Sequence, residues 1–274
     1  MMLATVFSLV ARRSWLGYSS LHNLHSMHAS MSTFNGGGGG QDGGVTIDYS
    51  EYTLVFDLDG TLVDSSASLQ KAVNDFLLEE GYTGRTLTRK EVEPLMGDGI
   101  NIVAARALQM VGLAARGDVG KTLGDIYDKD PSLDLTKLYP LVIETLSQLQ
   151  SSKFKMVVCT NKAQQPAMEI LNYFKLTKFF DSHCVGGDVL AVRKPHAEHL
   201  THAVSLKNGN PSKVFMIGDG HNDVAVAKNA NVPCIALSWG YSRVPLETLN
   251  PELIIDSFAA IPAAIDDILS RKKE

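Results

Sequence analysis

Cysteine is scarce in this sequence, and the cysteines present do not cluster. The three of them, Cys159, Cys184 and Cys234, are far apart and form no C-x-x-C pair. This spacing indicates neither a zinc site nor a disulfide framework. It fits a reducing compartment. We interpret Cys159 as a small apolar residue that packs within a strand, with a reactive thiol as the alternative.

Long hydrophobic runs and an excess of positive charge are missing as well. No stretch reaches the ~18 consecutive apolar residues that a membrane-spanning helix needs, so we expect no membrane partner. The formal net charge is −5. A mildly acidic chain lacks the basic footprint of a nucleic-acid binder. The 274 residues suffice for one large domain, or for a domain with an insertion.

Acidic residues are absent from residues 1–41, whose only charged side chains are Arg12 and Arg13. With several serines and a potential apolar helix face, this composition is typical of an organelle transit peptide. A secretory signal fits less well, because the arginines follow the apolar stretch instead of preceding it. A glycine-rich run at 36–44 then predicts a flexible linker. We interpret residues 1–50 as a mitochondrial transit peptide and linker. The alternatives are a plastid location or a disordered tail on a cytoplasmic protein.

The stretch from Thr53 to Ser65 is the centre of the sequence, because its apolar run stops at two acids. Leu54, Val55 and Phe56 predict a short buried strand, after which Asp57 and Asp59 point to the same side. Two close carboxylates repel each other unless a cation or proton separates them, which indicates a hard metal ion, an acid/base pair, or both. A surface turn is the alternative, since Asp-Gly is a common hairpin signal.

Residues 66–140 have apolar residues at helical spacing and no strand signal. The pattern predicts four helices, at 69–77, after the capping box Thr88–Glu91, at 102–110 and at about 120–129. An insertion of this length indicates a separate helical lid. Its turn contains Gly97 and Gly99, whose backbone groups could approach a substrate closely. An ordinary helical connection is the alternative.

From residue 141 onward, helix and strand patterns alternate, which predicts an α/β fold with a parallel sheet covered by helices. The predicted strands are 156–159, 183–186, 214–217, 235–237 and 253–255, and the predicted helices include 142–149, 166–173, 197–205 and 261–272. Three strands finish in polar groups, namely Asp57 with Asp59, Thr160, and Asp219. Because ligands bind at the carboxyl ends of parallel strands, we expect these side chains to converge on one crevice.

The converging residues suit phosphoryl transfer. Asp219 and Asp223 lie one helical turn apart and, with Asp57, offer three carboxylates to Mg²⁺. Asp223 has an alternative role as an acid that complements the helix dipole. Lys194 would balance the negative charge and contact a phosphoryl oxygen, and the Thr160 hydroxyl would donate to another, unless it merely caps the strand end.

Two acids divide the chemistry in this hypothesis. Asp57 is the predicted nucleophile, which forms an aspartyl phosphate. Asp59 protonates the leaving oxygen and then deprotonates water for the second step.

Four motifs in this order resemble the haloacid dehalogenase superfamily, and the resemblance extends from Thr53 to Leu269. The motifs are Asp57-Leu-Asp59-Gly-Thr61, Thr160-Asn161, Lys194-Pro195 and Gly218-Asp219-x-x-x-Asp223. The resemblance implies a Rossmann-like core, here 51–65 with 141–274, and an inserted helical cap, here 66–140. It also implies magnesium binding by the side chains of Asp57 and Asp219 and by the backbone carbonyl of Asp59. Thr160, Asn161 and Lys194 are then the expected substrate contacts, together with the cap glycines Gly97 and Gly99.

Within the superfamily the chain is similar to the phosphoglycolate phosphatases. The shared features are Gly186-Gly187-Asp188, Arg193-Lys194-Pro195-His196, Asn222-Asp223 and Trp239-Gly240-Tyr241. Gly220 stands where a Ser is common in those enzymes, Leu141 where Gly is usual, and Ala197 replaces a frequent Pro. These departures weaken the substrate assignment and leave the chemistry intact.

The resulting prediction is a magnesium-dependent phosphatase, monomeric or homodimeric, acting on a small phosphate monoester such as 2-phosphoglycolate. A sugar phosphomutase of the β-phosphoglucomutase kind, or a phosphatase of another small metabolite, is the alternative. Dehalogenase chemistry is disfavoured, because it would not explain Asp59. A non-enzymatic phosphate-binding protein is disfavoured by the intact set of polar residues.

Overall fold

A computed structural model describes residues 47–271 of the chain. The predicted transit peptide and most of the predicted linker therefore lie outside the described residues, as does the last residue of the final predicted helix. Ile47, Tyr49 and Tyr52 already pack against the core, so the structured part begins before the expected boundary at residue 51.

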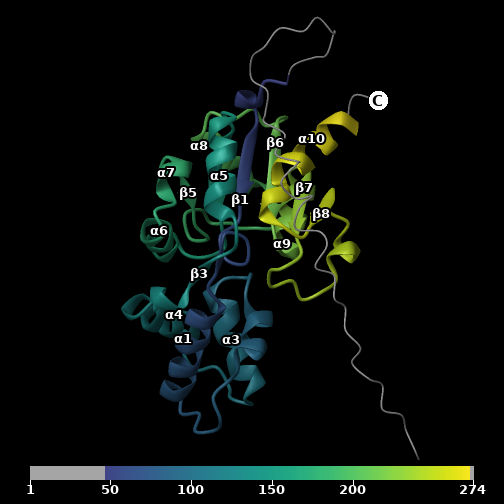
Figure 1. Cartoon of the computed structure of the whole chain (residues 1–274). Coiled ribbons are helices and arrows are strands. Elements are labelled where there is room, and N and C mark those ends of the chain that lie inside the picture. The colour runs from purple at the N-terminus through teal and green to yellow at the C-terminus, as the bar shows by residue number, and fades with distance from the viewer. Residues whose placement is uncertain (1–46, 272–274) are drawn as a thin grey trace, which may run out of the picture. The chain divides into compact units, whose positions relative to one another are not determined.

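Six parallel strands form one sheet in the order β5-β4-β1-β6-β7-β8 (Figure 1). Their bounds are β1 Thr53–Phe56, β4 Lys155–Cys159, β5 Cys184–Val185, β6 Val214–Gly218, β7 Cys234–Leu237 and β8 Leu253–Ile255. All five of the strands predicted after residue 141 are present, although the one expected at 183–186 has only two residues. β1 lies between β4 and β6, which places the ends of these three strands side by side.

Alternate residues of the central strands enter two different apolar clusters. Leu54 and Phe56 face the helices α5, α6, α7 and α10, whereas Val55 faces α8 and α9. These helices are α5 Val142–Ser151, α6 Gln164–Tyr173, α7 Thr177–Phe180, α8 Ala197–Leu206, α9 His221–Asn229 and α10 Ile261–Arg271. Burial on both faces explains why the strand sequences are continuously apolar. Helix α7 was not predicted, because one turn is too short to show a helical period.

The helices of the insertion have a third apolar cluster of their own. They are α1 Ser66–Glu79, α2 Arg89–Val92, α3 Ile100–Met110 and α4 Val119–Lys129, which matches the four predicted. Helix α1 ends before Gly81, whose φ of +88° suits glycine at this position. The capping box is present, with the Thr88 N–H and hydroxyl both donating to Glu91 Oε2 at 2.8 Å.

One short strand, β3 Lys137–Leu138, corrects the prediction that 66–140 contains no strand. β2 Val63–Asp64 pairs antiparallel with β3, so the chain enters and leaves the helical insertion through a two-stranded ribbon. Two residues per strand are too few for an alternating pattern to be recognised in the sequence. In Figure 1, α1, α3 and α4 lie together beyond this ribbon, beside the carboxyl ends of the sheet strands.

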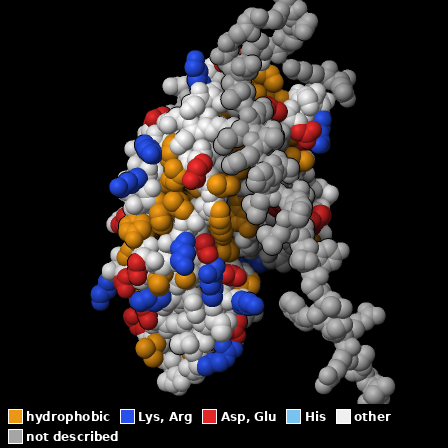
Figure 2. All heavy atoms as spheres, in the orientation of Figure 1, with side chains coloured by type: hydrophobic (Ala, Val, Ile, Leu, Met, Phe, Trp, Pro, Cys, Tyr) orange, Lys and Arg blue, Asp and Glu red, His pale blue; other side chains and the backbone are white. Residues whose placement is uncertain are grey.

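Charged side chains of both signs are interspersed over the face drawn in Figure 2. Some form pairs one helical turn apart, such as Lys71 with Asp75 and Lys121 with Asp125. Exposed pairs of this kind contribute little to stability. Within residues 47–271, none of the helices combines the length and the apolar character needed to cross a bilayer.

Candidate active site

The polar groups that follow β1, β4 and β6 do meet at one edge of the sheet. Asp57 follows β1 directly, Thr160 follows β4 and Asp219 follows β6. Asp57 and Thr160 line one pocket, and Asp57 and Asp219 line a second. The parallel neighbours bring together residues that are more than 100 positions apart in the sequence.

Lys194 provides a buried positive charge at the centre of this edge. Its Nζ lies 2.8 Å from Asp57 Oδ1 and 2.7 Å from Asp223 Oδ1, and the residue is only 2% exposed. Burial by itself lowers the pKa of Lys194, but the adjacent Asp223 and Asp57 carboxylates raise it overall. The ammonium therefore stays charged and holds the two carboxylates in place.

Three carboxylates surround a common point. Single oxygen atoms of Asp57, Asp219 and Asp223 all lie within 4.8 Å of one another. Burial raises the pKa of Asp57 to about 7, with Asp223 adding to the rise and Lys194 opposing it. Burial and the charges of Asp223 and Asp57 also raise the pKa of Asp219 well above its usual value. A hard cation bound between these buried carboxylates would offset the repulsion between their negative charges. The all-oxygen donor set of the cluster fits Mg²⁺.

Asp223 accepts hydrogen bonds at the start of a helix and also belongs to the carboxylate cluster. Its Oδ2 accepts the backbone N–H groups of Asp219 and Gly220, at 3.1 and 3.0 Å, at the start of α9. Its Oδ1 belongs to the pair with Lys194. A single side chain thus caps the helix and joins the carboxylate cluster.

The Asp59 carboxylate is directed away from that cluster. Asp59 Oδ1 accepts a hydrogen bond from the Ser65 hydroxyl and lies 3.5 Å from the Nζ of Lys162. Its side chain is not one of the three clustered carboxylates, so only its backbone carbonyl remains a candidate metal ligand. This separation gives Asp57 and Asp59 different surroundings, as different chemical roles require.

Thr160 and Asn161 are used differently from each other. The Thr160 Oγ1 accepts the Lys162 backbone N–H at 3.2 Å, which leaves its own proton available to a ligand. The Asn161 Nδ2 donates to the carbonyl oxygens of Gly97 and Lys194, both at 2.9 Å. In this arrangement the Asn161 amide ties the insertion to the Lys194 loop, and it has no further proton to offer a substrate.

The glycine turn of the insertion does come close to the sheet residues. Gly97 and Gly99 have φ values of +98° and +89°, which side chains rarely tolerate. The Gly97 carbonyl accepts both the Asn161 amide and the Asn222 Nδ2, each at 2.9 Å. A Cβ on Gly99 would lie 2.5 Å from the Arg193 guanidinium. The turn thus lies against residues of the chain itself and also lines the cavity described below, and its contact with a substrate stays a prediction.

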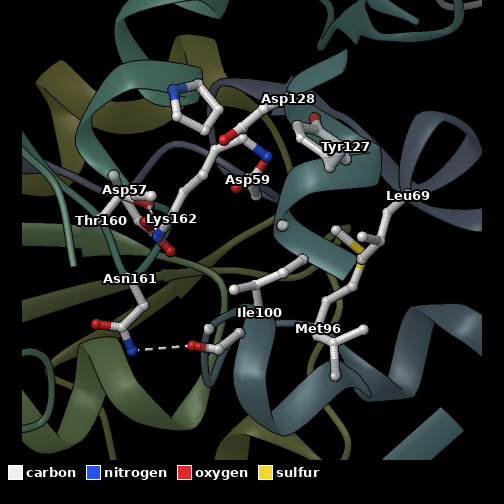
Figure 3. A pocket seen from close by; sticks show the side chains of 16 residues that line it. Asp57, Asp59, Leu69, Met96, Ile100, Tyr127, Asp128, Thr160, Asn161 and Lys162 are labelled. Atoms are coloured by element: carbon white, nitrogen blue, oxygen red, sulfur yellow. Dashed lines mark hydrogen bonds and ion pairs between the residues drawn. The ribbon is translucent and has the colours of Figure 1, made fainter. Parts of the chain in front are cut away.

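A cavity of about 120 Å³ opens beside Asp57 and Asp59 (Figure 3). Its wall from the insertion is mainly apolar, with Leu69, Met96, Ile100 and Val103. Tyr127 and Lys162 line it as well, and the sequence interpretation assigned no role to either. Lys162 directly follows the Thr160-Asn161 motif, and this position is the only feature of the sequence that could have marked it as a site residue. Nothing local marks Tyr127 among the residues of its helix.

Tyr241 is another site residue to which the sequence interpretation gave no role. Its backbone N–H donates to Asp219 Oδ2 at 2.6 Å, and its hydroxyl donates to Asp64 Oδ1 at 2.8 Å. The hydroxyl also accepts the Ser65 N–H at 2.9 Å. Tyr241 thereby connects the loop after β7 to the beginning of the insertion. The sequence had marked it only as part of Trp239-Gly240-Tyr241.

Comparison with known proteins agrees with this architecture. Residues 54–237 match the family model described as haloacid dehalogenase-like hydrolase. A phosphoglycolate phosphatase of Caulobacter vibrioides is 34% identical over 227 residues, covering 81% of this chain and 94% of that protein. One of Agrobacterium fabrum is 32% identical over 230 residues, covering 79% and 94%.

A solved structure extends the agreement to three dimensions. The crystal structure of a predicted phosphoglycolate phosphatase from Haemophilus somnus is 27% identical, with a TM-score of 0.71. The match covers 80% of this chain and 99% of that one. On its sequence and its fold, this chain belongs to the haloacid dehalogenase-like hydrolase family.

Proposed function

We propose that the protein is a magnesium-dependent phosphatase that hydrolyses 2-phosphoglycolate or a closely related small phosphate monoester. One observation carries the proposal, namely a buried Lys194 ammonium between Asp57 and Asp223, beside Asp219, at the edge where three parallel strands end. The substrate assignment is supported by the curated relatives, which are named phosphoglycolate phosphatases.

The first step is attack by Asp57 on phosphorus. Its Oδ1 is fixed by the Lys194 ammonium and by the Leu58 N–H at 2.7 Å, which sets the plane of the carboxylate. As the new bond to phosphorus forms, the ester P–O bond breaks and Asp59 gives its proton to the leaving oxygen. The products of this step are an aspartyl phosphate on Asp57 and the free alcohol.

The second step regenerates the enzyme. Asp59, now a carboxylate, takes a proton from water as the water oxygen attacks phosphorus. The bond between phosphorus and Asp57 breaks, releasing phosphate. Lys194 and the Thr160 hydroxyl stabilise the charge spread over the phosphoryl oxygens in both steps.

The site would hold Mg²⁺ through the carboxylates of Asp57, Asp219 and Asp223, with the Asp59 backbone carbonyl as a further ligand. When bound, the ion supplies positive charge against the phosphoryl oxygens. The fit rests on the oxygen donors clustered within 4.8 Å and on the raised pKa of Asp57 and Asp219, which burial causes.

We also propose that the helical residues 66–140 act as a lid over a core made of 51–65 and 141–274. The Gly97 carbonyl, held by Asn161 and Asn222, is the contact that closes it. A sugar phosphomutase would require several polar side chains around a sugar ring. The wall that the insertion contributes to the cavity is mainly apolar, so it offers a sugar ring few hydrogen bonds. This favours a small substrate over a sugar phosphate.

Phosphate release from 2-phosphoglycolate, with magnesium and with EDTA, tests the function. We expect Asp57→Asn to abolish turnover, because an amide cannot replace the nucleophile, while the fold stays nearly intact. Asp59→Asn should lower the rate by roughly 10²- to 10⁴-fold, the usual size of a lost proton transfer. Substantial activity in Asp57→Asn would refute the nucleophile assignment. Isomerisation of a sugar phosphate without net phosphate release would favour the mutase.

Targeting to the mitochondrion is a separate proposal, supported only by the composition of residues 1–50. A fluorescent fusion carrying residues 1–45 tests it by microscopy. A diffuse cytosolic signal would overturn the proposal, and a plastid signal would replace the organelle.

A further inference from the structure

Lys162 is a charged residue for which the reaction described above has no use. It lies in the loop after β4, directly after Thr160 and Asn161, and its side chain is only 13% exposed. Figure 3 shows this side chain extending toward Asp59, Tyr127 and Asp128. Among the described residues that line the cavity, Lys162 is the only one with a positive charge.

The contacts of the Lys162 ammonium leave room for another partner. Its Nζ lies 4.5 Å from the centre of the Tyr127 ring, a cation–π contact. The 3.5 Å to Asp59 Oδ1 is longer than the ~2.7–2.9 Å of a charge-assisted hydrogen bond. An ammonium has three donors, and the Tyr127 and Asp59 side chains engage two of them. The Lys162 ammonium can therefore donate a further hydrogen bond to an anionic group of a ligand.

The location of this ammonium matches the leaving group of the substrate. Phosphorus must lie next to Asp57, and the leaving oxygen next to Asp59. The remainder of the leaving alcohol then extends into the cavity between Asp59 and the apolar wall. A group one or two carbons from the ester oxygen would lie beside Lys162, since that ammonium is within 3.5 Å of Asp59.

The apolar surroundings of the Lys162 ammonium favour a negatively charged ligand group over a neutral one. Leu69, Ile100 and Val103 line the cavity and offer a ligand no hydrogen-bonding side chain. An ion pair against such a wall is screened less than one in water. Asp128 also lines the cavity, but it is itself exposed, so water screens its repulsion of an anion beside Lys162.

We propose that Lys162 is the specificity-determining residue that binds the carboxylate of the substrate's leaving group. The substrate class is then the phosphate monoesters of small hydroxy acids. This inference rests on the proposed phosphatase activity. It adds the residue that separates carboxylate-bearing esters from neutral ones of the same size.

The test compares Lys162→Met with the unchanged enzyme on two matched substrate pairs. Each pair sets a carboxylate ester against a neutral one, 2-phosphoglycolate against ethyl phosphate and 3-phosphoglycerate against glycerol 3-phosphate. The methionine keeps an unbranched chain against Tyr127 and removes the charge. We expect kcat/KM for the preferred carboxylate ester to fall roughly 10- to 100-fold, the size of a hydrogen bond to a charged group. Its neutral counterpart should change less than about threefold, so the preference for the carboxylate collapses.

Two further variants separate recognition from general damage. Lys162→Arg keeps the charge and should retain most of the carboxylate preference. Lys178→Met removes another ammonium stacked on an aromatic ring, 4.7 Å from the Phe179 ring centre and outside the cavity. It should leave both substrate classes unchanged.

The outcomes distinguish this inference from the proposed function. Equal losses on both esters of a pair would mean that Lys162 only positions Asp59, and would overturn the inference. An unchanged enzyme that releases phosphate from neutral and carboxylate esters equally well would overturn it too, while phosphatase activity stands. No magnesium-dependent phosphate release from any ester would instead overturn the proposed function itself.

Discussion

Asp219→Asn should stabilise the metal-free protein and remove its response to magnesium. Asp219 shares a buried space with Asp57 and Asp223, with their oxygens within 4.8 Å. Burial is the first cause of its raised pKa, and the two neighbouring charges are the next. The substitution removes a charge that the folded state accommodates poorly.

The replacement keeps the local hydrogen bonds. Asp219 accepts the Tyr241 N–H through Oδ2 and the Thr61 hydroxyl through Oδ1. Asparagine can accept from Tyr241 with its oxygen, and its amide can donate to Thr61, because a hydroxyl also accepts. Both neighbours thus keep a hydrogen-bond partner, and the side chain keeps its size against Gly60 and Gly240.

The magnitude follows from Coulomb's law. Two unit charges 4.8 Å apart interact by about 3 kcal/mol at an effective dielectric constant of ~20. Proton uptake relieves part of this repulsion near neutral pH, because the pKa of Asp57 is raised to about 7 by burial. We therefore expect Asp219→Asn to gain about 1–3 kcal/mol in the free energy of unfolding at pH 8 without metal.

Urea denaturation at pH 8, once in EDTA and once in magnesium, measures both effects. A ligand at 100 times its dissociation constant stabilises a protein by about 2.7 kcal/mol, so the unchanged protein should gain that order in magnesium and the variant much less. The stability advantage of Asp219→Asn should thus shrink or reverse in magnesium. Asp75→Asn, at an exposed pair with Lys71, is the control and should change stability by less than about 0.5 kcal/mol. Lower stability of Asp219→Asn in EDTA would refute the reasoning.

Two further predictions concern the protonation of a buried histidine and an ion pair of the insertion. His199 is buried, its Nδ1 accepts the Lys194 backbone N–H, and its Nε2 faces the Gly186 carbonyl. Only the neutral imidazole can make both hydrogen bonds, because it accepts at one nitrogen and donates at the other. Burial accordingly lowers the pKa of His199 to about 4. The unfolded chain then binds the extra proton between pH 6.5 and 4, so stability falls by up to about 3 kcal/mol as the pH drops through this window. Urea midpoints at pH 4.5 and 7.5 should show a smaller loss for His199→Gln, and an equal loss would contradict this assignment. Asp98 in the insertion pairs with Arg243 after β7 at 2.6 Å. Asp98→Asn should raise amide hydrogen exchange at the start of α3, and unchanged exchange would show that other contacts hold this turn.

The sequence was sufficient to predict the sheet and the residues at its edge, for a physical reason. Buried parallel strands are apolar on both faces, so they are recognisable without knowing their partners. Their ends are marked by the first polar residue, as Asp57, Thr160 and Asp219 are. Adjacent parallel strands then bring these ends together whatever the intervening chain does.

What the sequence could not predict depends on contacts between distant loops. The Asn161 amide reaches Gly97, 64 residues away, and this pairing has no local pattern. The same holds for Lys162 with Tyr127 and for Asp98 with Arg243. These contacts follow from how the insertion packs against the sheet edge, which periodicity within one helix cannot specify. The cavity beside Asp57 and Asp59 was therefore the least predictable part of the site.

Charge balance gives an independent reason to expect that the reaction needs a divalent cation. The three clustered carboxylates, those of Asp57, Asp219 and Asp223, face one ammonium group, that of Lys194. With all of these groups ionised, a phosphate ester that carries two negative charges would enter a site that is already negative by two. A divalent cation cancels this excess before the substrate arrives, and the shared oxygen donors are where it would bind. Removing magnesium should thus weaken substrate binding as well as slow turnover, whereas a metal needed for chemistry alone would leave binding unchanged.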